Sequence, residues 1–225
     1  MEKDYLPPPA KAQCYIAAVR KLLGCAVREP HGILKGSLLF LLCALPLVTY
    51  GPARLTAVYY MGKRCDGIQV TWKSAASFGW GVGGGGAGLK GWLMGLSDMT
   101  ALILAAGSVY AILEMNLPAA LRFPYAVVLL LDLIYLASGI FRYPALAREP
   151  EAKIHMLMLR GFLLVIGSPW WAFLFSCVQL LWLMICLLTG VGLPLLYPAG
   201  AALLSHCAYT EFIKHYSKGN GVNGV

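Results

Sequence analysis

The sequence predicts an all-α protein built as a polytopic bundle of membrane helices. Hydrophobic residues make up 59% of the chain and charged residues only 12%, whereas soluble domains are about half apolar and a quarter charged. Apolar runs such as YAVVLLLDLIYLASGIF and WWAFLFSCVQLLWLMICLLTG approach or reach the roughly 20 residues that cross a bilayer. We therefore expect about six membrane helices, with the lipid bilayer as their solvent.

The first membrane element is predicted to be a helical hairpin. A single straight span would carry basic residues on both flanks, against the positive-inside bias. A helix that enters near Ile33 and reverses at Thr49–Pro52 keeps both flanks cytoplasmic. Gly51 permits a tight reversal, and Pro52 costs no hydrogen bond at the start of the returning helix. Arms of about 15 to 25 Å leave open whether the hairpin spans fully or is re-entrant, and Arg54 near its tip must pair or snorkel.

The remaining elements alternate between apolar spans and basic connections. The glycine-rich stretch 65–90 lacks the Walker pattern, so a flexible linker or close helix packing is expected there. The short EMNLPA connector makes the two long spans antiparallel neighbours. The basic segment 142–160 is expected to be cytoplasmic, first as a loop and then as an interfacial helix. The predicted spans after the hairpin are residues 91–113, 119–141, 169–188 and 193–212.

The chain is predicted to contain one membrane domain, residues 31–213, between two cytoplasmic ends. Residues 1–30 form an amphipathic N-terminal segment, whose basic helix suits the inner leaflet, with a soluble interaction helix as the alternative. Residues 214–225 form a flexible tail. The net charge of +8 is spread over the loops, which predicts a multi-pass protein of the inner membrane with both termini cytoplasmic and no nucleic-acid partner.

Two acids, Asp98 and Asp132, fall inside predicted spans. At about 1.5 Å per residue from the cytoplasmic ends, they lie roughly 10 and 14 Å deep, within about one turn of each other. An ionised acid in lipid costs at least a few kcal/mol. The pair is therefore either a shared proton or cation site, or a structural pair bonded to neighbouring helices. The basic residues available for the structural alternative are Lys90, Arg142 and Arg160.

No catalytic, metal or cofactor site is predicted. Ser168 and Ser205 lack a GxSxG elbow. The seven cysteines include no CxxC pair and are expected to be small buried hydrophobes. His206 adjoins Cys207, but adjacent helix positions point in different directions and make a poor chelate. The sequence therefore predicts a protein without enzymatic activity.

The interrupted span HGILKGSLLFLLCALPLVTYGPARLTAVYYMGK, with TWKSAASFGWG after it, is the most specific local pattern in the chain. In these segments, and in ASGIFRYPALAR and LRGFLLVIGSPWWAFLFSCVQLLWLM, the chain resembles the YesL family of small bacterial membrane proteins. The resemblance covers residues 30–212. Its turn motif consists of Pro46, Thr49, Gly51 and Pro52.

This resemblance implies an accessory or regulatory role in carbohydrate uptake by ABC-type transporters. The expected partner is then a carbohydrate ABC permease or a membrane sensor. The resemblance supplies no catalytic residues. The alternative hypothesis is a small autonomous transporter or channel that uses Asp98 and Asp132 as a proton or cation site.

Overall fold

The computed structural model describes residues 12–44, 49–82, 86–115, 118–188 and 192–219. Over these residues the chain forms nine α-helices and no strand, which confirms the all-α prediction. The helices are α1 (Ala12–Arg28), α2 (Pro30–Ala44), α3 (Tyr50–Cys65), α4 (Trp72–Trp80), α5 (Ala87–Leu113), α6 (Ala119–Arg148), α7 (Ile154–Gly167), α8 (Pro169–Leu188) and α9 (Gly192–Gly219).

Three helices in the described ranges are long and apolar enough to cross a membrane, namely α5, α6 and α8. The sequence predicts about six such helices, so the structure contains fewer full-length spans than expected. One reason is the length of the first hairpin. Its helices α2 and α3 contain 15 and 16 residues, which corresponds to about 22 to 24 Å.

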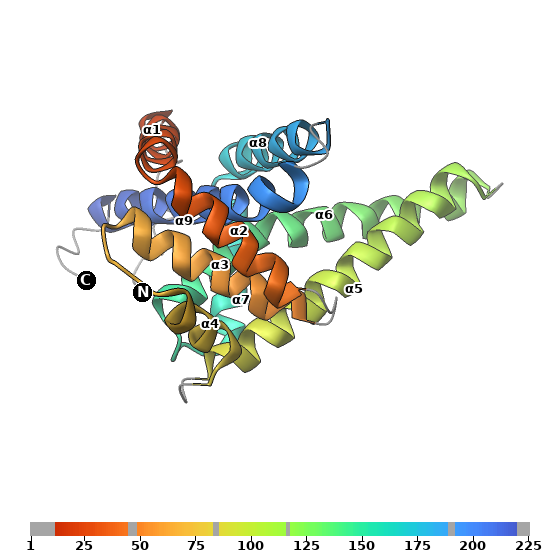
Figure 1. Cartoon of the computed structure of the whole chain (residues 1–225). Helices are drawn as coiled ribbons and strands as arrows, with labels where there is room; N and C mark the ends of the chain where they lie inside the picture. The colour runs from red at the N-terminus through yellow and green to blue at the C-terminus, as the bar shows by residue number, and fades with distance from the viewer. Residues whose placement is uncertain (1–11, 45–48, 83–85, 116–117, 189–191, 220–225) are drawn as a thin grey trace.

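Helix α3 forms the centre of the bundle. It packs against α2, α4, α5, α6 and α9, and Figure 1 shows it crossing the middle of the bundle between α9 and α4. Ten of its 16 residues are buried, most of them small. Small side chains allow neighbouring helices to approach closely. The segment predicted as a short returning helix is therefore the core element of the fold.

Helices α2 and α3 pack against each other as the predicted hairpin requires. Helix α3 begins at Tyr50 with Thr49 as its N-cap residue. The Thr49 hydroxyl donates to the Cys43 carbonyl oxygen at 2.5 Å and so ties the end of α2 to the start of α3. Pro52 is the third residue of α3, where its missing N–H breaks no helical hydrogen bond. Pro46 lies outside the described residues.

Gly51 has a different role from the one that the sequence predicts. Positive φ values among the described residues occur at Gly67 and Gly81, so Gly51 makes no left-handed turn. A Cβ atom at Gly51 would instead overlap the Gly91 carbonyl oxygen and lie 2.8 Å from the Gly95 Cα. Glycine permits such a backbone-to-backbone approach. The start of α3 is thus pressed against α5.

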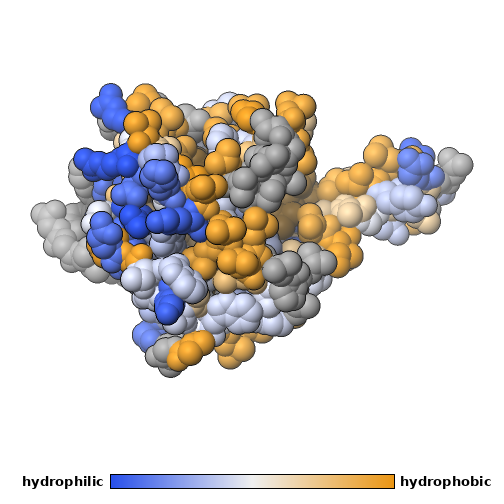
Figure 2. All heavy atoms as spheres, viewed as in Figure 1, coloured by the Kyte–Doolittle hydropathy of each residue, from blue (hydrophilic) through white to orange (hydrophobic). Residues whose placement is uncertain are grey.

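Helices α5 and α6 leave the bundle together and project from it as one long hairpin (Figure 1). We call residues 102–115 and 118–133 the arm. Small residues of α5, among them Ala105, Ser108 and Ala111, are buried, whereas most large side chains of the arm are exposed. Figure 2 shows hydrophobic residues along the arm, with hydrophilic residues at its tip and on the opposite side of the bundle.

Two predicted boundaries are wrong. Helix α6 continues through Pro144 to Arg148, so Arg142 lies in a helix and not in the predicted loop. Helix α9 continues to Gly219, into residues 214–225 that were predicted to be a flexible tail. For the glycine-rich stretch, either a flexible linker or close helix packing was predicted, and helix α4 occupies part of it. A Cβ atom at Gly79 of α4 would lie 2.8 Å from the Pro52 carbonyl oxygen of α3. Gly79 thus allows α4 to pack closely on α3, which is the second of the two structures predicted for this stretch.

We expect Gly51→Ala to destabilise the bundle by about 1 to 3 kcal/mol, because the new methyl group has no space against α5. The matched control is Gly107→Ala on the arm, where a Cβ atom would meet nothing within 4 Å. In a helix interior that change should stabilise by about 0.5 to 1 kcal/mol. Thermal unfolding of the full chain in detergent measures both effects. Equal stability of the two variants would contradict the packing of α3 on α5.

Candidate functional site

A buried ionic cluster lies where α3, α5 and α6 meet. Asp98 of α5 is 4% exposed, and Arg142 of α6 is fully buried. Arg142 Nη2 donates to Asp98 Oδ1 at 2.8 Å, and the Tyr143 hydroxyl donates to Asp98 Oδ2 at 2.8 Å. Arg54 Nη1 of α3 lies 3.4 Å from Asp98 Oδ2. Both carboxylate oxygens of Asp98 are therefore engaged.

Aromatic rings and other acceptors surround the two guanidinium groups, although Arg142 Nε has no hydrogen-bond partner among the described residues. The Arg142 guanidinium carbon lies 4.0 Å from the centroid of the Tyr135 ring, and Nη2 also donates to the Tyr135 carbonyl oxygen at 3.1 Å. Arg142 Nη1 approaches the Met158 sulfur of α7 at 3.2 Å. The Arg54 guanidinium carbon lies 4.5 Å from the centroid of the Tyr143 ring. Such cation–π contacts strengthen when water is excluded.

The local sequences of α6 and α7 make room for the buried arginine. Helix side chains point toward the N-terminus, so the Arg142 side chain reaches back to the level of Tyr135. On α7, a Cβ atom at Gly161 would lie 2.5 Å from Arg142 Cγ. The missing side chain at Gly161 therefore lets the Arg142 stem pass between the two helices.

The cluster contains two cations and one carboxylate. Arg142 is paired with Asp98 in the dry interior, whereas Arg54 is 19% exposed and also donates to the Tyr50 hydroxyl at 3.2 Å. Arg54 was expected either to pair or to snorkel toward water. In the structure it pairs with Asp98. The other predicted partners of the acids bond elsewhere. Lys90 donates to the Pro150 carbonyl oxygen, and Arg160 donates to Glu149.

Asp132 of α6 has different surroundings from Asp98. Its Oδ2 atom is enclosed and has no hydrogen-bond partner among the described residues. Its neighbours in the sequence, Leu131 and Leu133, are exposed on the arm. No hydrogen bond joins Asp132 to Asp98 in the part of the chain that the structure describes. The structure therefore shows one acid with three partners and one buried acid oxygen without any.

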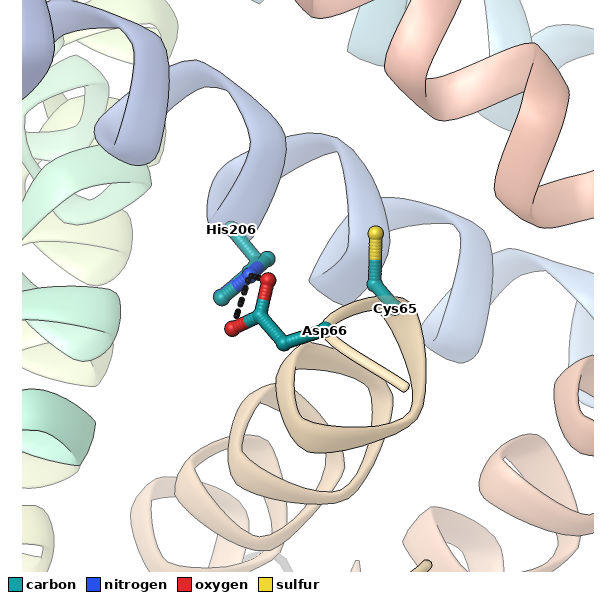
Figure 3. Close-up of side chains that lie close together, drawn as sticks. All are labelled: Cys65, Asp66 and His206. Carbon is teal, nitrogen blue, oxygen red and sulfur yellow. Dashed lines mark hydrogen bonds and ion pairs between the residues drawn. The ribbon is translucent and has the colours of Figure 1, made fainter. Parts of the chain in front are cut away.

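A second polar cluster lies at the end of α3 beside α9. Figure 3 shows the Asp66 carboxylate facing the His206 imidazole, with the Cys65 side chain beside them and its sulfur directed away from the pair. The potential ligand atoms of the three residues lie within 4.8 Å of one another. His206 Nε2 is 3.4 Å from the Asp66 carboxylate, and Lys21 Nζ of α1 is 3.1 Å from it. These groups, with the His206 hydrogen bond foremost, hold the pKa of the Asp66 carboxyl well below its usual range.

Three cysteines meet at this second cluster. Cys25 of α1 and Cys65 form a disulfide, and Cys207 Sγ of α9 lies 4.0 Å from Cys65 Sγ. The prediction that the cysteines are separate buried hydrophobes is wrong for Cys25 and Cys65. No local motif could reveal the cluster, because 40 residues separate Cys25 from Cys65 and 142 separate Cys65 from Cys207.

The chain matches no protein-family model, no curated protein and no solved structure. Resemblance to the YesL family therefore stays a prediction from the quoted segments. The ionic cluster, the arm and the cysteine cluster are the structural features that bear on function.

We expect Asp98→Asn to destabilise the protein by about 3 to 5 kcal/mol, because Arg142 would keep its charge in a dry site without a counterion. Asp132→Asn is the matched control on the neighbouring helix. It breaks no ion pair, so its effect should stay within about 0.5 kcal/mol. Thermal unfolding in detergent gives both values.

If Asp98→Asn does not fold, the double variant Asp98→Leu/Arg142→Met tests the same pairing. Removing both charges leaves no fully buried ion unpaired, because the remaining cation, Arg54, is 19% exposed and still bonds to Tyr50. This variant should therefore be more stable than either single change. Additive losses in the double variant would show that the two charges are not coupled.

Proposed function

We propose that this chain is a non-enzymatic integral membrane protein that acts as an accessory subunit of a larger membrane assembly. The arm docks against a membrane helix of the partner, and the rest of the bundle holds the arm in place. The observation that carries the proposal is Asp132, an acid on an apolar arm whose Oδ2 has no hydrogen-bond partner.

A charged acid inside a membrane usually pairs with a basic or hydrogen-bonding group, because burying its charge costs free energy. Even translocon-based scales give about 2.5 to 3.5 kcal/mol for Asp at the centre of a membrane helix. Asp98 has such partners inside the chain, namely Arg54, Arg142 and Tyr143. Asp132 does not, and because its side chain as a whole is only half-buried, its natural complement is a Lys or Arg side chain on a helix of another protein.

The surface of the arm suits such a contact within the bilayer. Its two helices carry exposed apolar side chains, while Glu114 and Arg122 near the tip are exposed to solvent. An apolar shaft with a polar tip is the distribution expected of a hairpin that crosses the membrane. The large apolar side chains exposed on the arm include Leu102, Ile103, Leu104, Tyr110, Leu113, Leu121, Phe123, Leu130, Leu131 and Leu133.

We place the chain in the bacterial inner membrane with both termini in the cytoplasm. This orientation puts the basic segments on one side, as the positive-inside rule requires. The α2–α3 hairpin then contributes two short membrane elements beside α5, α6, α8 and α9. Together they make about six membrane helices, of which three are, within the described ranges, both long and apolar enough to cross a membrane.

The class of partner that we propose is a carbohydrate ABC permease or a membrane sensor. Support for this class comes from the quoted segments that resemble the YesL family. The projecting arm (Figure 1) and the unpaired Oδ2 of Asp132 support a docking contact with such a partner. No residue of the chain is assigned a catalytic role.

A second candidate function, autonomous proton or cation transport, is favoured by the same unpaired oxygen of Asp132. The hypothesis drawn from the sequence is that Asp98 and Asp132 carry the ion together. Because Asp98 already has three partners, Asp132 alone would have to carry the ion. Loss of proton or cation flux from liposomes in the Asp132→Asn variant would favour this candidate over the accessory role.

The accessory role predicts a partner whose binding depends on Asp132. We expect the C-terminally tagged chain, extracted from its native membrane in mild detergent, to retain a membrane protein in near-stoichiometric amount. Asp132→Asn should reduce this recovery at least tenfold, because the charge pair across the interface is lost. Glu114→Gln, which neutralises an exposed acid at the arm tip, is the matched control and should retain the partner. Quantitative mass spectrometry provides the comparison.

Charge reversal makes this test specific. Asp132→Lys should abolish the complex, and an acid in place of the basic residue in the partner's span should restore it. Equal recovery from the parent, Asp132→Asn and Glu114→Gln proteins would contradict the proposed function.

A further inference from the structure

The Cys65–Asp66–His206 cluster has the chemistry and the spacing of a transition-metal site. Around tetrahedral zinc, with bonds of about 2.0 to 2.3 Å, neighbouring ligand atoms are about 3.3 to 3.8 Å apart. His206 Nε2 and the Asp66 carboxylate are already 3.4 Å apart. The Cys65 Sγ completes a set in which every pair of ligand atoms is within 4.8 Å. To meet at one ion, these atoms must approach one another by up to about 1 Å.

Cys25 carries the sulfur nearest to that of Cys65 and is the candidate for a fourth ligand. Its sulfur is bonded to that of Cys65 in the disulfide, so cleavage of the bond leaves two thiols at the same place. Reduction by two small thiols breaks the Cys25–Cys65 bond, gives each cysteine sulfur one proton and joins the two small thiols as a disulfide. Both cysteines then lose their protons when they bind a metal ion.

The structure orients the histidine before any metal binds. A Cβ atom at Gly62 of α3 would lie 2.6 Å from His206 Nδ1. The imidazole therefore rests against bare backbone, and a side chain at residue 62 would displace it. His206 is 5% exposed, so the surrounding helices hold the ring as a fixed ligand. Fixed orientation of a ligating histidine is a feature of metal sites.

We propose that the reduced protein binds one Zn²⁺ ion through Cys25, Cys65, Asp66 and His206. Mixed sulfur and nitrogen ligands favour zinc over Mg²⁺ or Ca²⁺, which prefer oxygen. Two thiolates and one carboxylate around Zn²⁺ leave one net negative charge, and Lys21 lies 3.1 Å from Asp66 to balance it. Cys207, with its sulfur 4.0 Å from Cys65 Sγ, stands outside the ligand set as a weak hydrogen-bond donor to the thiolate.

Zinc binding and the disulfide are two alternative ways of joining α1 to the bundle. Both involve Cys25 of α1 and Cys65 of α3, but only the metal also includes His206 of α9. Thiols on the cytoplasmic side of a membrane are kept reduced. In the cytoplasmic orientation proposed above, the metal-bound form is therefore the one that prevails.

The test uses the full chain in detergent, treated with a chelator, reduced with a phosphine and desalted without oxygen. Titration with Co²⁺ should produce the visible bands of tetrahedral cobalt and a near-ultraviolet thiolate-to-cobalt band, saturating at one equivalent, and Zn²⁺ should abolish both. The oxidised protein should give neither band. Cys177→Ser, which removes an exposed cysteine on α8, is the control and should bind Co²⁺ as the parent does.

Variants of the site decide the ligand assignment. His206→Gln and Cys65→Ser should lose the cobalt spectrum, and Gly62→Ala, which keeps every ligand but displaces the imidazole, should weaken Co²⁺ binding about 10- to 100-fold. Monodispersity and helical circular dichroism establish that each variant is folded. Absence of both bands from the reduced, monodisperse parent, or an unchanged spectrum in folded His206→Gln, would overturn the proposal.

Discussion

The pairing of Arg142 with Asp98 is the interaction on which the rest of the bundle depends. A fully buried guanidinium group costs several kcal/mol unless neighbouring groups replace its water. Here the replacements come from Asp98 of α5, Tyr135 of α6 and Met158 of α7. Because these groups belong to different helices, α5 and α6 cannot slide past each other without leaving a charge unpaired. The pair thereby fixes the root of the arm.

Helix α3 connects the two clusters of functional interest. Arg54 in its second turn joins the ionic cluster, and Cys65 at its end joins the cysteine cluster. A glycine near each end admits a neighbour: Gly51 meets α5, and Gly62 meets the imidazole of α9. The short helix after the predicted reversal is thus the element through which the arm, α1 and α9 are positioned relative to one another.

Composition and local pattern predict the helices of this protein well, because lipid imposes long apolar runs. Helix α8 lies within the predicted boundaries, from Pro169 to Leu188. Local pattern fails where a distant partner changes the outcome. Arg142 beside Pro144 is typical of a loop, yet Asp98, 44 residues earlier, keeps it inside a helix. The same limit hides the cysteine cluster, whose members come from three helices far apart in the sequence.

The acids show a second kind of limit. Helix counting places Asp98 and Asp132 at similar depths, but depth does not determine which neighbours a side chain meets. Asp98 faces the crowded junction of α3, α5 and α6, whereas Asp132 lies on the projecting arm. One acid therefore joins three helices, whereas the other keeps an oxygen without a hydrogen-bond partner among the described residues.

The central claim, that the arm crosses the membrane and carries its tip to the far side, is tested most directly by thiol labelling in spheroplasts. Glu114→Cys places a thiol at the tip, and Lys153→Cys places one at the opposite end of the bundle, just before α7. We predict that a membrane-impermeant maleimide adds label to Glu114→Cys, above the parent protein, in intact spheroplasts and to Lys153→Cys only after permeabilisation. Labelling of both positions under the same condition would contradict the claim.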